Sequence, residues 1–225
     1  MLQEMAKALE SVAVQQSAEK KAKSILSRLH EEAIREVGQE KFDRVFPQST
    51  ELSEFAPNME IQAEQIKEVF ERMPELEYEN WVRMSIDQRV EALNRFEQEI
   101  AKIEKRNPIT IIHEKTKPGL HGYFDNKNGV IMISDNDLGK NDWKDYRETL
   151  DTLFHEGRHA YQHYNLEVSR TEQSSELVNA WRVNLKELGY DKSAVAGFKR
   201  YYTQPIEVDA RCFAETVIKK LGLQY

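Results

Sequence analysis

Apolar residues recur at helical spacing along most of the chain, and this pattern predicts a mostly helical protein. Within each such segment an apolar side chain returns every three or four residues, which places these side chains on one face of a helix. The segments with this spacing are parts of residues 1–46, then about 61–72, 86–105, 143–164, 172–188 and 205–218. We therefore expect each helix to bury one face, and the helices together to enclose a core.

Polar and proline residues mark where several of these helices begin and end. Ser85 and Gln88 form the pattern S-x-x-Q, which is typical of a capping box at a helix start. Pro74 and Pro108 each follow a helical segment, and proline disfavours helical geometry in the residue before it. Pro205 suits the first turn of the last helix. These signals bound the helices independently of the apolar spacing.

Between residues 109 and 137 the spacing changes from helical to extended. Residues 109–112 are rich in β-branched side chains and indicate a strand, and residues 119–124 and 130–134 indicate two more. The Asn-Gly pair at 128–129 is a strong signal for a tight hairpin turn. The sequence therefore predicts a small antiparallel sheet just before the helix at 143–164.

The fold class that follows is α+β, mostly helical, with the small antiparallel sheet packed on the helix at 143–164 and further helices at the N-terminus. Turn signals near Pro47 and Pro57 separate the N-terminal segment from the rest. We accordingly divide the chain into an N-terminal helical region at 1–56 and one domain at 57–225.

Composition and charge exclude several classes of protein. The chain has 225 residues and a net charge of −7, and an acidic chain lacks the basic face that nucleic-acid binding needs. Cys212 is the only cysteine, so neither an internal disulfide nor a thiolate zinc site can form. No run of 18 apolar residues predicts a membrane span. No secretory signal is visible near Met1, so we expect a cytoplasmic protein, with export by a signal-independent route left open.

Residues 155–159 read H-E-x-x-H and carry the clearest chemistry. Positions four apart share a helix face, so His155 and His159 can reach one metal ion, and Glu156 can take a proton from water beside it. Gly157, within the motif, lowers helix propensity by about 1 kcal/mol relative to Ala, which indicates close packing there. Six residues past His159 stands Asn165, where a metzincin would have a third His. A Glu on a later helix remains as the third ligand.

The segment starting at Pro205 contains a candidate for that glutamate. It also completes a pair of motifs that is found in a known family of proteins. Its motif E-x-x-A-x-x-F-A stands complete at Glu207, Ala210, Phe213 and Ala214. Together with the first motif it resembles the ImmA/IrrE-type zincin peptidases. It is also similar to the zincin domains of bacterial polymorphic toxins, which share "HE-x-R-HA-x-Q" and "P-x-E-x-DA" runs. The resemblance covers residues 78–225 and departs at the extra helical stretch 172–188.

The resemblance implies a zincin-like domain in which His155, His159 and Glu207 bind Zn²⁺ and Glu156 is the general base. It implies hydrolysis of a peptide bond, with an extended protein or peptide substrate along the edge strand of the sheet. Such a zinc metallopeptidase would be a regulator or a toxin-like effector, with a regulatory or immunity protein as a further partner. The alternative is a non-catalytic module that keeps the zincin fold for binding or structure.

Other side chains near the motifs are weaker candidates. Tyr201, Tyr202 and His121 have the chemistry to stabilise the transition-state oxyanion, although spacing singles out none of them. Asp209 is two residues from Glu207 and so points to a different face of the helix. It could orient a metal-binding imidazole only if the local geometry brings it close.

Overall fold

The computed structural model describes residues 57–190, 201 and 204–224. Its helices are α4 (Pro57–Phe70), α5 (Tyr78–Trp81), α6 (Ile86–Glu104), α7 (Asp135–Leu138), α8 (Trp143–Glu167), α9 (Ser175–Arg182) and α12 (Pro205–Lys220). A 3₁₀ turn, η1 (Pro74–Leu76), and a π-helical turn, η2 (Val183–Leu188), join them. The strands are β1 (Thr110–Glu114), β2 (Gly122–Asp125) and β3 (Val130–Ser134). The helices predicted for residues 1–56 lie outside the described residues.

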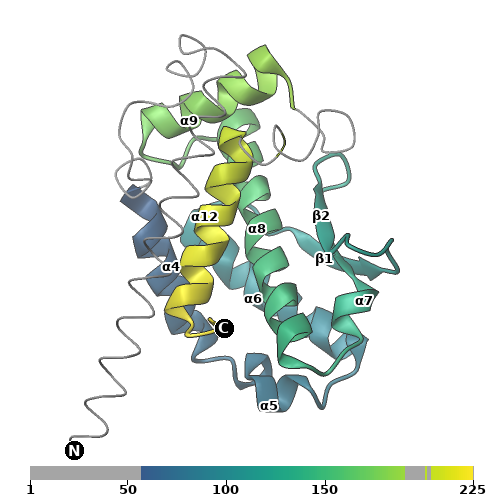
Figure 1. Ribbon diagram of the computed structural model, residues 1–225. Helices are drawn as coiled ribbons and strands as arrows, with labels where there is room; N and C mark the ends of the chain where they lie inside the picture. Colours follow the sequence, from purple (N-terminus) through teal and green to yellow (C-terminus); the bar gives the residue numbers. More distant parts are fainter. Residues whose placement is uncertain (1–56, 191–200, 202–203, 225) are drawn as a thin grey trace, which may run out of the picture.

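The predicted fold class is confirmed, because the described chain is mostly helical with one small sheet. The long helix α8 lies at the centre, with α12 alongside it and α4 beyond α12 (Figure 1). The sheet lies on the other side of α8, which β2 contacts directly (Figure 1). Among the described residues, no helix combines the length and the apolar character that crossing a bilayer requires. Helix α8 therefore joins the helical side of the molecule to the sheet.

The sheet is mixed rather than wholly antiparallel. Strands β2 and β3 form the predicted antiparallel hairpin, with Phe124 opposite Ile131. Strand β1 pairs with β3 in parallel, with Ile111 also opposite Ile131, so the strand order is β1-β3-β2. The most apolar strand, β3, takes the central place, where it is covered on both faces. Strand β2 is consequently an edge strand, and it is the edge nearest α8.

Helix starts follow the local signals at α6 and α12, whereas the predicted helical stretch 172–188 is α9 from Ser175 to Arg182 followed by the π-helical turn η2. Ser85 caps α6 through a complete capping box, in which its backbone N–H donates to Gln88 Oε1 at 2.8 Å. Helix α12 begins at Pro205, as predicted. Helix α4 is described from Pro57 onward and so already includes the four residues before the predicted start at Ile61.

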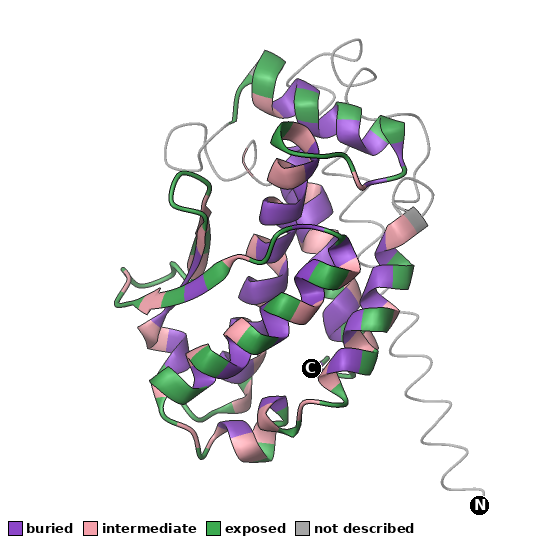
Figure 2. Cartoon of the chain, turned by 180° about the vertical axis from the view of Figure 1, so that it is seen from behind, coloured by how far each residue is buried: buried purple, intermediate pink, exposed green. Residues whose placement is uncertain are grey.

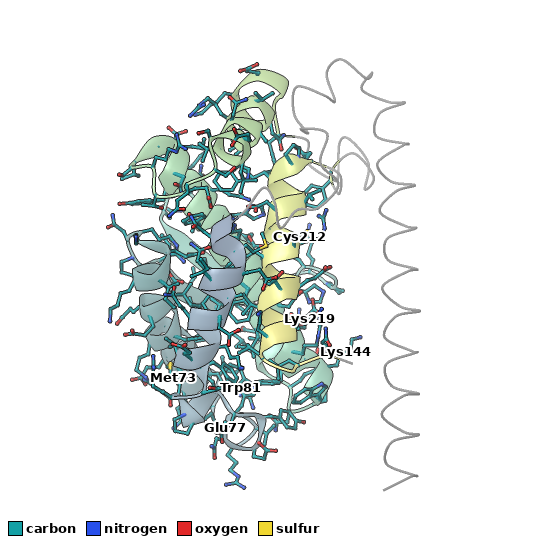
Figure 3. All side chains as sticks on the ribbon, turned by 90° about the vertical axis from the view of Figure 1, so that its left-hand side faces the viewer. Met73, Glu77, Trp81, Lys144, Cys212 and Lys219 are labelled. Carbon is teal, nitrogen blue, oxygen red and sulfur yellow. The ribbon has the colours of Figure 1, made fainter. Side chains whose placement is uncertain are left out.

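Aromatic side chains fill the core between the helices and the sheet. Buried residues gather on the inward faces of the helices, while the outward faces are exposed (Figure 2). Trp81 on α5, labelled in Figure 3, is fully buried against Tyr146 of α8, with ring centroids 5.7 Å apart. Further along α8, Phe154 packs edge-on against Phe96 of α6. These contacts fix α8 along its length and so set the position of the H-E-x-x-H motif.

Strand β2 comes unusually close to α8 at Gly122. A Cβ at this position would lie 2.5 Å from both the Met132 carbonyl oxygen and Thr152 Cγ2, so only glycine fits. Gly157, by contrast, has room, because a Cβ there would meet nothing closer than Arg106 Nη2 at 3.7 Å. The close approach that the sequence predicted at Gly157 is therefore wrong, and the tight contact between sheet and helix lies at Gly122 instead.

Candidate metal centre

The structure brings His155, His159 and Glu207 together from two helices. His155 and His159 lie one turn apart on α8, with their Nε2 atoms 3.1 Å from each other. Glu207 comes from the first turn of α12, and its two oxygens each lie 3.4 Å from one of these nitrogens. The three side chains form a cluster that could hold a metal ion. The sequence motifs had predicted this set of ligands.

The spacing of the three donor atoms suits a tetrahedral metal ion. Ligands at 2.0–2.2 Å from a tetrahedral zinc ion lie about 3.3–3.5 Å from one another. His155 Nε2 lies 3.1 Å from His159 Nε2 and 3.4 Å from Glu207 Oε2, which is close to these values, and the donor atoms of the three residues all lie within 4.8 Å of one another. Glu207 Oε2 is buried and has no hydrogen-bond partner among the described residues. A buried carboxylate oxygen without a donor is costly, and a cation would satisfy it.

The electrostatics of the cluster favour positive charge at its centre. Burial alone would lower the pKa of His159, but its hydrogen bond to Glu207 and the charges of Glu156 and Glu207 raise this pKa to about 9. Burial alone would raise the pKa of Glu207, but the neighbouring His155 and His159, whose Nε2 atoms each lie 3.4 Å from one of its oxygens, hold this pKa well below its usual range. The metal-free site therefore holds an imidazolium beside an ionised carboxylate, and a metal cation can replace the proton.

Tyr190 is a residue of this site that the sequence analysis missed. Its hydroxyl donates to Glu207 Oε1 at 2.6 Å, which leaves Oε2 as the oxygen for a metal. Burial and the bond to Glu207 raise the pKa of Tyr190, so the phenol stays protonated. Tyr190 follows Gly189 beyond the end of η2 and belongs to no motif, so no spacing signal could have found it.

Of the three candidates for oxyanion stabilisation, one lies at the site. Tyr201 packs edge-on against Tyr190, and burial together with the Glu207 charge raises its pKa above the usual value. Tyr202 lies outside the described residues. His121 bonds to Asp137 at 2.9 Å and lies 3.9 Å from Glu148. Glu148 is seven residues before His155, about 10 Å along the helix, so the structure does not place His121 with the metal ligands.

Glu156 is held between the metal-binding residues and the edge strand. The backbone N–H of Phe124 on β2 donates to Glu156 Oε2 at 2.9 Å. The charge of Glu156 also acts on His159 and on Tyr201, which places it beside the cluster. One oxygen of Glu156 is thus fixed by the sheet and the other remains for proton transfer. The motif predicted Glu156, but the sequence gave no indication of its partner Phe124.

Behind His159 lies a buried polar chain that connects the two helices. His159 Nδ1 lies 2.8 Å from Gln162 Oε1, and Gln162 Nε2 donates to Asp209 Oδ2 at 2.7 Å. Asp209 also accepts two hydrogen bonds from Arg158, at 2.9 and 3.0 Å. Asp209 thus reaches the imidazole through Gln162 rather than directly. The sequence analysis named Asp209 as an orienting group but overlooked Gln162 and Arg158.

Comparison of the chain with protein-family models, with curated protein sequences and with solved structures finds no significant match. The resemblance of its motifs to zincin peptidases therefore stays a prediction from the residues. The geometry of His155, Glu156, His159 and Glu207 carries the functional argument.

Proposed function

We propose that this protein is a zinc-dependent peptidase. The observation that carries the proposal is the meeting of His155 and His159 from α8 with Glu207 from α12, beside Glu156. Two imidazoles and one carboxylate are the donor set of many catalytic zinc sites, which keep a fourth position open for water or substrate. Zinc fits these nitrogen and oxygen donors better than magnesium or calcium, which prefer oxygen alone.

The chain's own residues supply the proton transfers of hydrolysis. A bound zinc ion supplies a Lewis acid that makes water nucleophilic at neutral pH and polarises a carbonyl group. Glu156 accepts the proton of the attacking water and passes it to the leaving amine. The Phe124 N–H holds one oxygen of Glu156, so the carboxylate keeps a fixed direction while the other oxygen carries the proton. Tyr201 is the candidate phenol at the site for donating to the developing oxyanion, since the Tyr190 hydroxyl already donates to Glu207.

The position of β2 supports a peptide as substrate. Strand β2 is the edge strand nearest α8, and Phe124 presents its N–H on the edge that faces Glu156. An extended peptide can pair with such an edge, which places its backbone carbonyl groups beside the general base. A peptidase that binds its substrate in this way could have either of two roles. It could be a regulator that cleaves one cellular protein, or a toxin-like effector held by an immunity protein.

The deciding experiment combines a metal assay with the variant Glu156→Gln. We expect about one zinc ion per chain in both the wild type and the variant, because Glu156 is not a ligand. Cleavage of a proteome-derived peptide mixture, followed by mass spectrometry, should fall at least a hundredfold in the variant. Glu167→Gln is the matched control, since this exposed glutamate ends the same helix and pairs only with Lys186 among the described residues.

The outcomes separate the two functions. Zinc binding with cleavage that Glu156→Gln abolishes and Glu167→Gln preserves supports the peptidase. Zinc binding without cleavage of any peptide by the wild type supports the non-catalytic module. Equal cleavage by wild type and Glu156→Gln would remove the proposed base.

A further inference from the structure

The buried hydrogen bonds that run from His159 through Gln162 and Asp209 to Arg158 determine which nitrogen of His159 carries a proton. Gln162 is fully buried, and its amide nitrogen donates to the Ile206 carbonyl oxygen at 2.9 Å and to Asp209 Oδ2 at 2.7 Å. A carbonyl oxygen and a carboxylate can only accept hydrogen bonds. The –NH₂ group of Gln162 must therefore face α12, and its oxygen must face His159.

Arg158 keeps this arrangement from reversing. It binds both oxygens of Asp209, and its guanidinium lies over the rings of Tyr161 and Phe213, at 4.5 and 4.8 Å from their centroids. A guanidinium carries donors only, so both Asp209 oxygens act as acceptors toward it. Arg158 is itself fully buried, so the pair is held out of water and its geometry is rigid.

The orientation of the Gln162 amide determines the protonation of both ring nitrogens of His159. An oxygen of Gln162 at 2.8 Å from Nδ1 requires a proton on that nitrogen. In the neutral imidazole the other nitrogen, Nε2, then carries the lone pair. Nε2 is the atom that lies 3.1 Å from His155 Nε2 and 3.4 Å from Glu207. Only this tautomer can donate an electron pair into the centre of the cluster.

We infer that Gln162, locked by Asp209 and Arg158, is a positioning residue that sets the tautomer and direction of His159 for metal binding. The inference deepens the proposed function and rests on its metal site. Metal-binding histidines usually donate their second N–H to a carboxylate or a carbonyl group, and loss of such a partner weakens metal binding 10–100-fold. Here the amide of Gln162 accepts the His159 N–H, and the Asp209 carboxylate fixes the direction of that amide.

The chain offers a matched control for this role. Asn165 is another buried amide on α8, one turn beyond Gln162, and its oxygen accepts from the backbone N–H groups of Thr171 and Glu172, both at 2.7 Å. Its bonds anchor the loop before α9. Although Glu172 of that loop lies 3.9 Å from Arg158, among the described residues the hydrogen bonds of Asn165 go to Tyr161, Thr171 and Glu172, and none goes to Gln162 or His159. Gln162→Met and Asn165→Leu each replace a buried amide by an apolar side chain of similar size. Both should destabilise the fold, but only the first should change the metal site.

Two measurements test the inference. Zinc affinity is measured by competition with a chelator, and the Nδ1–H proton of His159 is followed by NMR for its exchange with water. We expect Gln162→Met to weaken zinc binding 10–100-fold and to lose the slowly exchanging Nδ1–H, and Asn165→Leu to preserve both. Because Nδ1 is protonated with or without metal, the NMR measurement on metal-free protein stands even if the wild type binds no zinc, the result that would refute the proposed function.

A measurement on the wild type covers the case in which Gln162→Met fails to fold. The ¹H and ¹⁵N signals of the His159 ring report which of its nitrogens carries a proton. We expect a proton on Nδ1 both in metal-free protein and with zinc added, and no proton on Nε2 once zinc is bound. A zinc-bound ring protonated on Nε2 instead of Nδ1, unchanged zinc affinity in Gln162→Met, or equal weakening in Asn165→Leu would each overturn the inference.

Discussion

At the scale of single residues, Tyr190 binds one oxygen of Glu207 and leaves the other for the proposed metal ion. We expect Tyr190→Phe to weaken zinc binding about tenfold, because Glu207 Oε1 loses its hydrogen-bond donor at 2.6 Å and the carboxylate can turn. Chelator competition measures the effect. Tyr123→Phe is the control, since this exposed phenol also donates to a glutamate, Glu114, but on the outer surface of the sheet. Equal zinc affinities of wild type and Tyr190→Phe would contradict the role of Tyr190.

The raised pKa of His159 predicts how zinc binding depends on pH. In metal-free protein this pKa is about 9, so the imidazole is protonated at pH 7 and must lose a proton when a metal binds. The apparent zinc affinity should therefore rise about tenfold for each pH unit up to 9 and level off above it. Calorimetry in buffers of different ionisation enthalpy should show about one proton released per zinc at pH 7. An affinity that is flat between pH 7 and 9 would contradict this reading of the site.

At the same scale, the sequence predicts the residues that act through local spacing and misses those that act through tertiary contact. His155, Glu156 and His159 lie within little more than one helix turn, and Glu207 stands in a motif of its own, so the clustering of the two histidines with Glu207 could be predicted. Tyr190 and the Phe124 N–H reach the site from a turn and a strand that no motif marks. Their contribution depends on how α8, β2 and η2 pack, which local patterns do not specify.

At the scale of elements, helix signals were more informative than strand signals. The capping box at Ser85 and the proline at 205 fixed the starts of α6 and α12, because capping involves only neighbouring residues. The Asn-Gly turn fixed the β2–β3 hairpin for the same reason. Strand β1 carries no signal for its partner, and its parallel pairing with β3 follows from which strand is the most apolar. The mixed sheet was therefore beyond the reach of the sequence pattern.

The packing of α8 predicts opposite effects on stability for substitutions of two glycines, Gly157 within the helix and Gly122 on strand β2 beside it. Gly157→Ala should raise the free energy of unfolding by about 0.5–1 kcal/mol, because alanine favours the helix and its methyl group would meet Arg106 only at 3.7 Å. Urea unfolding of the metal-free protein measures the change. Gly122→Ala should have the opposite effect, since its methyl group would lie 2.5 Å from a backbone oxygen. Destabilisation by Gly157→Ala would mean that α8 and Arg106 pack more tightly than the structure has them.

At the scale of the whole molecule, buried ionic groups surround the metal-binding helix. Arg106 binds Glu97 at 2.5 and 2.9 Å and Glu104 at 2.6 Å; all three are buried, and Arg106 lies beside Gly157. Together with the pair of Arg158 and Asp209, they form a polar layer inside an otherwise apolar core. Removing one partner of a buried pair leaves an uncompensated charge, so this layer holds α8 in one position. No pattern in the sequence distinguishes these charged residues from those on solvated helix faces.

The two ligand-bearing helices make metal binding a property of the whole fold. In the proposed site, zinc would join α8 to α12 only in the folded state, so at a concentration 1,000 times its Kd it should add about 4 kcal/mol to the free energy of unfolding. For a chain of this size the melting temperature should rise by about 8–16 °C. Glu207→Gln should remove most of this shift, whereas Glu215→Gln, an exposed position two turns further along α12, should keep it. Differential scanning calorimetry with and without zinc compares the three proteins. An equal zinc-induced shift in Glu207→Gln and wild type would place the ion elsewhere, because a ligand set confined to α8 cannot hold the two helices together.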